Sequence, residues 1–256
     1  MPVEHPELLT CGAAVPVEVR PAPSEAEWGA LVAVSGASAE AAAELARRDD
    51  ALRETLGWWS AMPCVNAITE HAGGLGGLTV WESDYAFASA LRQARPEGGG
   101  LPLYGGPLGL ALLPVCRDGL VMARRSSSLH WAPGRLRLPT EGVLMEDLSG
   151  PGASRAIDVV ALAWRLMEEE LGSASASATV VPVGFYPAPA RLAFVAVAHL
   201  DCTVEDLVES VGSAPDGFEH TFEPFGSAAE ALAALGEDRA HASARLLEYV
   251  ARGQRT

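Results

Sequence analysis

The pattern of apolar and polar positions divides the chain into two parts. In the first part, serine caps followed by helix-forming residues predict helices over Ser24–Val34 and Ser38–Leu56. In the second part, short apolar runs bounded by turn residues are typical of buried strands. Between the two lies Pro96–Pro102, whose three consecutive glycines fit neither a helix interior nor a strand interior. We therefore expect a mainly helical N-terminal region over residues 1–97 and a second domain over residues 103–256.

The second domain is expected to begin with a hairpin. The apolar run Leu108–Cys116 predicts a strand, the Asp-Gly pair at Asp118 a tight turn, and Leu120–Ala123 the returning strand. A long loop, from Pro139 to about Ser154, leads to the strongest helix pattern, Arg155–Leu171. Further predicted elements are strands at Leu136–Leu138, Thr179–Phe185 and Leu192–Leu200, and helices at Val204–Val211, after Ser227 and at His241–Arg252. This mixture predicts an α/β or α+β fold.

The helix over Arg155–Leu171 ends in an unusual way. Its apolar positions recur at helical spacing, which predicts one face packed on a core. Its last turn carries three consecutive glutamates, from Glu168 to Glu170, at the negative end of the helix dipole, where a negative charge costs ~0.3–1 kcal/mol. A divalent cation such as Mg²⁺, which prefers carboxylate ligands, would turn this repulsion into attraction. Because these glutamates contradict the usual preference for positive charge at the end of a helix, they indicate a candidate functional site.

The segment from Arg165 to Gly172 resembles the second half of the Nudix box, whose pattern is G-x5-E-x7-R-E-U-x-E-E-x-G-U, with U a bulky aliphatic residue. Arg165 matches the arginine, Glu169 and Glu170 match the paired glutamates, and Gly172 matches the glycine. The preceding hairpin is also similar to the family, as is the stretch ending at Gly142, where the family usually has Pro-Gly-Gly. The resemblance covers about residues 106–225.

One departure from the pattern removes a carboxylate. Leu166 stands where the family has a glutamate directly after the arginine. It lies three and four residues before Glu169 and Glu170, on the same helix face as both. A site of two glutamates remains, which one carboxylate of the late acidic segment, Glu219 or Glu223, could complete.

A second departure concerns the loop before the helix. From Gly142 to Arg165 there are 23 positions, against 14 in the family pattern, so the loop carries nine extra residues. Glu146, with Asp147 beside it, is the nearby candidate for the first glutamate of the box.

The resemblance implies an α/β/α sandwich with a mixed sheet and a site for Mg²⁺ or Mn²⁺. The metal would polarise a diphosphate and activate the attacking water. Arg165 would orient Glu169 through an i, i+4 pair. The implied catalytic residues are Glu169, Glu170, Arg165 and Glu146, and the implied metal ligands are Glu169, Glu170, the Gly142 carbonyl and Glu219. The general base stays open among four residues: Glu146, Glu219, His220 and His130.

Three residues near the predicted hairpin are candidates for substrate binding. Arg125 follows a strand and could pair with a phosphate, although a solvated strand end is an equal alternative. His130 and Trp131 could stack on a base or another ring, although a plain surface loop also explains them.

Charge and composition narrow the class of partner. The chain has 18 basic residues, all of them arginine, against 33 acidic ones, which gives a net charge of −15. This balance argues against nucleic acid or an anionic membrane as the main partner. The absence of lysine excludes a Walker-type phosphate site and a Schiff-base lysine. Four widely spaced cysteines and no signal sequence favour a cytoplasmic protein.

These observations favour a divergent Nudix-like hydrolase that cleaves a small-molecule diphosphate, such as a nucleoside diphosphate linked to another moiety. Two alternatives stay open: a catalytically degenerate ligand-binding or regulatory protein, and a biosynthetic enzyme that reuses the scaffold. The N-terminal region could pack on the core, form the interface of a homodimer or cover the pocket.

Overall fold

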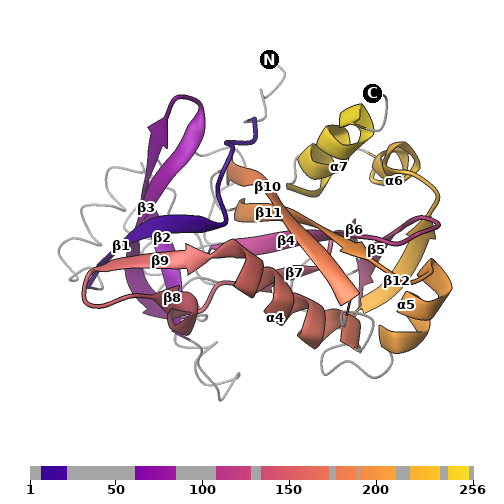
Figure 1. Ribbon diagram of the computed structural model, residues 1–256, viewed down its shortest axis with the longest axis horizontal. Helices are drawn as coiled ribbons and strands as arrows, with labels where there is room; N and C mark the ends of the chain where they lie inside the picture. The colour runs from indigo at the N-terminus through magenta and orange to yellow at the C-terminus, as the bar shows by residue number, and fades with distance from the viewer. Residues whose placement is uncertain are drawn as a thin grey trace, which may run out of the picture.

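The computed structural model describes residues 7–21, 61–84, 108–127, 134–172, 177–188, 191–211, 220–236 and 242–253. The helices expected over Ser24–Val34 and Ser38–Leu56 and the glycine-rich junction lie outside these residues. The described elements form two sheets and four α-helices (Figure 1).

The first sheet combines strands from distant parts of the chain. Its order is β2-β3-β1-β9-β8, in which β1 is parallel to β3 and antiparallel to β9. The five strands are β1 (Ala14–Arg20), β2 (Ala61–His71), β3 (Gly74–Asp84), β8 (Leu148–Ser149) and β9 (Ser154–Asp158). Strands before the predicted boundary near residue 100 therefore share a sheet with strands after it.

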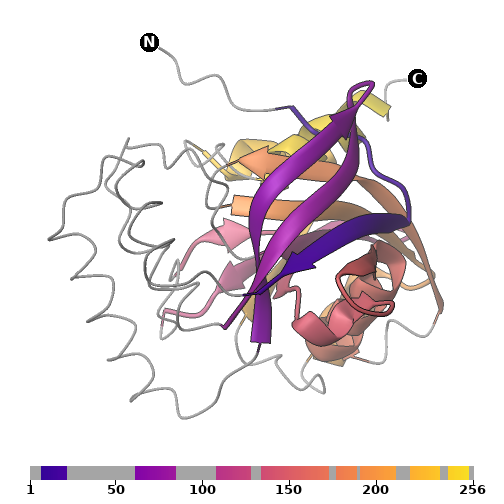
Figure 2. The same cartoon turned by 90° about the vertical axis from the view of Figure 1, so that its left-hand side faces the viewer.

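The described part of the N-terminal region contains three strands, and the expectation of a mainly helical region otherwise falls on residues outside the described ones. In β1, the residues Val15, Val17 and Val19 are buried and alternate with exposed ones, a period of two that favours a strand. The segment interpreted as turn-rich is the long hairpin of β2 and β3 (Figure 2). Its tight turn has positive φ at Ala72 and Gly73 (50° and 81°), as hairpin turns require.

The second sheet has seven strands, and its main order is β10-β11-β4-β5-β12. The sheet is mixed, because β11 is parallel to β4 while the other described strand pairs of the sheet are antiparallel. Its strands are β4 (Gly109–Val115), β5 (Leu120–Arg125), β6 (Leu136–Arg137), β7 (Thr140–Gly142), β10 (Ala178–Ala188), β11 (Arg191–Leu200) and β12 (His220–Phe225). The Asp-Gly hairpin predicted between Leu108 and Ala123 is confirmed by β4 and β5.

The strands β4 and β5 separate soon after their turn. They pair directly only at Val115 and Leu120, and farther along β7 pairs with β4 while β6 pairs with β5. The predicted long loop after Pro139 thus begins with a short strand that inserts beside β4. This arrangement brings the residues around Gly142 under the helix that follows.

Helices cover both faces of the second sheet (Figure 1). On one side lie α4 (Val159–Leu171) and α5 (Val204–Val211), and on the other lie α6 (Ala228–Ala234) and α7 (Ala242–Gly253). Alternate residues of β4 enter two apolar clusters: Leu110 and Leu112 face α4, and Ala111 and Leu113 face α7. The expected α/β/α sandwich with a mixed sheet is therefore confirmed.

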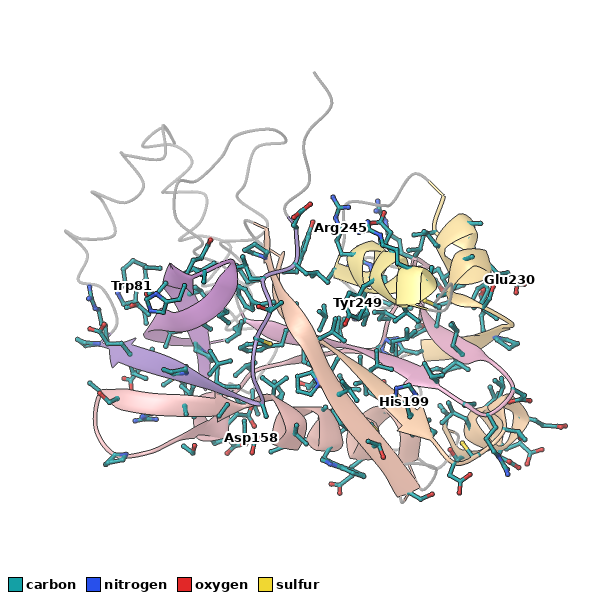
Figure 3. All side chains as sticks on the ribbon, turned by 45° about the horizontal axis from the view of Figure 1, so that its top comes forward. Trp81, Asp158, His199, Glu230, Arg245 and Tyr249 are labelled. Atoms are coloured by element: carbon teal, nitrogen blue, oxygen red, sulfur yellow. The ribbon has the colours of Figure 1, made fainter. Side chains whose placement is uncertain are left out.

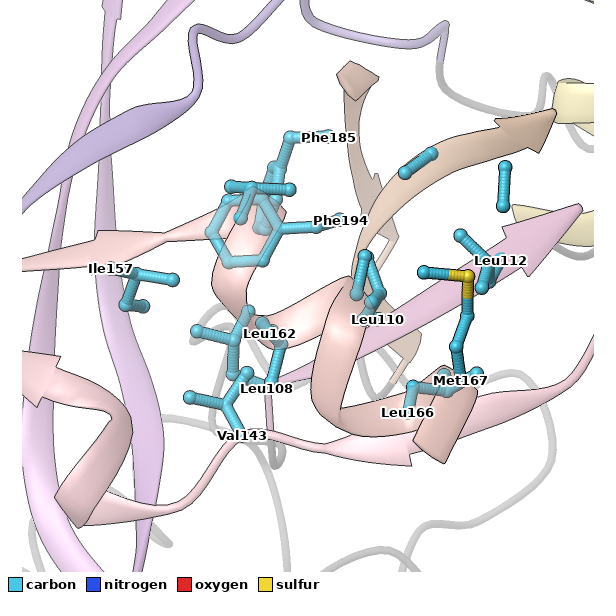
Figure 4. Packing of buried hydrophobic residues seen from close by; sticks show 14 of the residues in the cluster. Leu108, Leu110, Leu112, Val143, Ile157, Leu162, Leu166, Met167, Phe185 and Phe194 are labelled. Atoms are coloured by element: carbon cyan, nitrogen blue, oxygen red, sulfur yellow. The ribbon is translucent and has the colours of Figure 1, made fainter. Parts of the chain in front are cut away.

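Helix α4 begins four residues later than the helical pattern alone indicates, at Val159 in place of Arg155. Residues Ser154–Asp158 are extended because they pair with β1. Asp158 then caps the helix (Figure 3), since its Oδ1 accepts hydrogen bonds from the backbone N–H groups of Val160 and Ala161 at 2.9 and 3.0 Å. The inner face of α4 packs against β4 and β11 in the core (Figure 4).

Among the described residues, no helix combines the length and the apolar character that crossing a bilayer requires. The cytoplasmic location remains an expectation from the sequence.

Candidate functional site

Arg165 organises the polar groups beside the end of α4. Its Nη2 donates to the carbonyl oxygen of Gly142 at 2.8 Å and to Oδ2 of Asp147 at 2.9 Å. Its Nη1 lies 3.3 Å from Oε2 of Glu169, one helical turn farther along α4, and 3.5 Å from Oε1 of Glu141. The guanidinium therefore joins the helix to the loop that contains Gly142, and it makes the predicted i, i+4 pair.

Glu141 belongs to this cluster because of the strand register. It pairs with Leu110 across β7 and β4, and paired residues point to the same face, which here is the α4 side. Burial raises the pKa of Glu141 to about 7; Arg165 and a hydrogen bond from the Gly142 N–H oppose the rise, and the charges of Glu169 and Glu170 add to it. Several carboxylates are thus crowded into a partly buried space.

The two glutamates that match the family pattern, Glu169 and Glu170, have different surroundings. The side chain of Glu169 is 33% exposed and is held by Arg165. The side chain of Glu170 is only 4% exposed, and its Oε1 lies 3.2 Å from Nε2 of His220. The adjacent carboxylates are therefore oriented by two different donors, one from the same helix and one from β12.

Leu166 is part of the hydrophobic core. Its side chain is fully buried on the inner face of α4, next to Met167 (Figure 4). The helix position that carries a glutamate in the family pattern therefore faces apolar neighbours in this chain.

The loop residue that reaches Arg165 is Asp147. It lies at the end of a short 3-10 helix, Met145–Asp147, and its Oδ2 also accepts a hydrogen bond from the N–H of Leu144. Glu146, the residue chosen from the sequence, is exposed. The segment between Gly142 and Arg165 includes β8 and β9, which belong to the other sheet.

The acidic segment expected as a late loop is, in its described part, the strand β12. Its residues alternate between the two faces of the sheet: His220 and Phe222 face the α4 side, while Glu223 faces the opposite side and pairs with Arg124. Glu223 therefore does not join the glutamates of α4. Glu219 lies outside the described residues.

Two arginines share the α4 side of the sheet. Arg125 pairs in register with His220, and Arg137 pairs with Ala123, which belongs to the core cluster beneath α4. Both arginines are half-buried. Sequence reasoning identified Arg125 but missed Arg137, although the alternation of β5 and β6 would have placed both on one face. His130 and Trp131 lie outside the described residues.

The oxygen atoms of this site are suitable for a hard divalent cation. They comprise carboxylate oxygens and one main-chain carbonyl, the ligand types that Mg²⁺ and Mn²⁺ prefer. Within the described part of the chain, no three His, Cys, Asp or Glu side chains already converge in a metal-binding arrangement.

No protein-family model matches the sequence, and no curated protein matches it. Among solved structures, DR0079 from Deinococcus radiodurans aligns with 16% identity and a TM-score of 0.40, covering 73% of this chain and 97% of that one. A hydrolase of the NUDIX family from Clostridium perfringens aligns with 12% identity and a TM-score of 0.34, covering 56% and 97%. Likeness of this degree assigns no activity to this chain.

Proposed function

We propose that this protein is a Nudix-like hydrolase that cleaves a diphosphate within a small molecule, with Mg²⁺ or Mn²⁺ as cofactor. The observation that supports it is the convergence on Arg165. Gly142 lies 23 residues before this arginine and Glu169 four residues after it, yet both contact its guanidinium. Gly142, Arg165 and Glu169 all match the Nudix pattern. Their contacts bring the Gly142 carbonyl close to the end of α4, where the glutamates that would bind the metal lie.

The charge of the site supports a bound cation. The carboxylates of Asp147 and Glu169 contact one guanidinium, so negative charge remains in excess even when Glu141 is protonated. Glu169, Glu170 and the second lone pair of the Gly142 carbonyl would hold the ion. When bound, it would polarise the diphosphate and lower the pKa of the attacking water.

The protein's own groups would hold the substrate. Arg125 and Arg137 lie on the α4 side of the sheet, where a guanidinium can pair with phosphate oxygens in a bidentate manner. We also propose that His130 and Trp131 stack on the group linked to the diphosphate.

The test is a panel of dinucleotides, nucleotide sugars and nucleoside triphosphates, incubated with the purified protein and Mg²⁺ or Mn²⁺. We expect phosphate-containing products from at least one class. Glu169→Gln should lower this activity by about 100-fold or more, because loss of even an outer-shell partner of a metal costs ~10–100-fold. Glu168→Gln, on the exposed side of the same turn, is the matched control and should keep the activity. A panel without turnover would contradict the proposal.

One observation favours a second candidate, a ligand-binding protein without turnover. The buried Leu166 takes the place of a carboxylate and cannot bind a metal. If this candidate is correct, members of the same panel will raise the melting temperature of the protein without being cleaved.

A further inference from the structure

The contribution of β12 to the site is a histidine. Because β12 pairs with β5 in a fixed antiparallel register, alternate residues point to opposite faces of the sheet. His220 and Phe222 point toward α4, whereas Glu223 points away and pairs with Arg124. The strand therefore presents an imidazole to Glu170 at the position where the late acidic segment was expected to provide a carboxylate.

The contact between His220 and Glu170 is buried. Nε2 of His220 lies 3.2 Å from Oε1 of Glu170, and the two side chains are 2% and 4% exposed. A carboxylate removed from water to this extent requires a hydrogen-bond donor, since an unsatisfied charged group in the interior costs several kcal/mol. Because a carboxylate accepts hydrogen bonds, we assign the ring proton to Nε2, the tautomer in which this contact is a hydrogen bond.

The histidine ring is itself held in place. Its centroid lies 6.2 Å from that of Phe222, and the two rings are nearly perpendicular, at 89°. Nδ1 is buried and forms no hydrogen bond within the described residues. Within the described residues, the ring therefore makes its polar contact through Nε2 alone.

We propose that His220 is a positioning residue that fixes the carboxylate of Glu170 through the Nε2–H···Oε1 hydrogen bond. Oε1 of Glu170 is engaged by the histidine, so rotation of the carboxylate, and with it the position of Oε2, is restricted. This inference depends on the proposed function, in which Glu170 is a metal ligand. Donors that orient ligating carboxylates in this way typically change metal affinity by ~10–100-fold when they are removed.

The test compares two amides at position 220. In His220→Gln the amide nitrogen lies near the position of Nε2, and in His220→Asn it lies near that of Nδ1. His199→Gln, at an exposed position on β11 (Figure 3), is the control for loss of a histidine. Mn²⁺ binding is measured by electron paramagnetic resonance for each folded variant, together with hydrolysis of any substrate found in the panel.

We expect His220→Asn to bind Mn²⁺ about 10–100-fold more weakly than the wild type, and His220→Gln to stay within about threefold of it. The double variant His220→Asn, Glu170→Gln should lose no more than Glu170→Gln alone, because the histidine acts through that glutamate. If the asparagine variant does not fold, His220→Leu, which has no hydrogen-bond donor, takes its place in this cycle.

Two outcomes would overturn the inference while leaving the hydrolase intact: Mn²⁺ affinity unchanged in His220→Asn, or equal losses in the glutamine and asparagine variants. Absence of Mn²⁺ binding by the wild-type protein would instead overturn the metal-dependent function and the inference together.

Discussion

Replacing Glu141 with glutamine removes a carboxyl group that the folded protein keeps partly protonated at neutral pH. The pKa of Glu141 is raised from 4.5 to about 7, first by burial and then by the charges of Glu169 and Glu170. A difference of this size between the folded and unfolded states corresponds to about 3 kcal/mol. Glutamine is close in shape to the protonated acid, so it removes the cost of ionisation and keeps the packing.

The sign of the effect follows from proton linkage. Above pH 4.5 the unfolded chain releases a proton that the folded state retains up to pH about 7. The stabilisation by this retained proton is fully present below pH 4.5, and it is lost as the pH rises through about 7. Relative to the wild type, Glu141→Gln should therefore be nearly neutral at about pH 4 and more stable by about 3 kcal/mol at about pH 8.

The assay is urea unfolding of both proteins across this pH range in buffer containing a chelator. Glu146→Gln, which replaces an exposed carboxylate nearby, is the matched control for the loss of one acidic side chain, and the gain at high pH should be larger for Glu141→Gln than for this control. A constant difference between Glu141→Gln and the wild type from pH 4 to pH 8 would refute the argument that this carboxyl is held protonated by its surroundings.

Three further predictions concern other parts of the fold. Leu166→Ala should lower the free energy of unfolding by about 2–5 kcal/mol in chemical denaturation, because the side chain is fully buried; a loss below about 1 kcal/mol would contradict its place in the core. Asp158→Ala removes the cap of α4 and should cost about 0.5–2 kcal/mol in thermal unfolding, whereas Asp158→Ser should retain most of the stability. Glu223→Gln should leave hydrolysis within about twofold of the wild type, because Glu223 lies on the far face of the sheet; a loss as large as that of Glu169→Gln would contradict this assignment.

Elements with strong local signals can be predicted from the sequence. The hairpin at Asp118 is specified by its Asp-Gly turn, and the helix after Ser227 by its cap, where Ser227 Oγ accepts from the N–H of Glu230 at 3.2 Å. The ion pair between Arg165 and Glu169 can likewise be predicted from their spacing of four residues on one helix. In each case, residues within a few positions of one another determine the geometry.

The remaining features depend on pairing over long distances. The strand Ala14–Arg20 shows alternation, but its neighbours come from residues 78–81 and 154–158, which no local pattern indicates. The places of Glu141 and His220 at the site follow from the register of β7 on β4 and of β12 on β5. Because a shift of one residue would turn either side chain to the opposite face, the site could not be completed before the register was known.

The position of β1 has a consequence for synthesis on the ribosome. Its antiparallel partner β9 is translated about 140 residues after it, which at ~5–20 residues per second is a delay of about 7–28 s. During this interval one backbone edge of β1 is unpaired, and closing so large a loop costs entropy before any contact compensates for it. Ribosome-bound chains that end before residue 154 should therefore be cleaved readily by protease near β1. A chaperone that binds extended apolar segments should bind the same part of these chains.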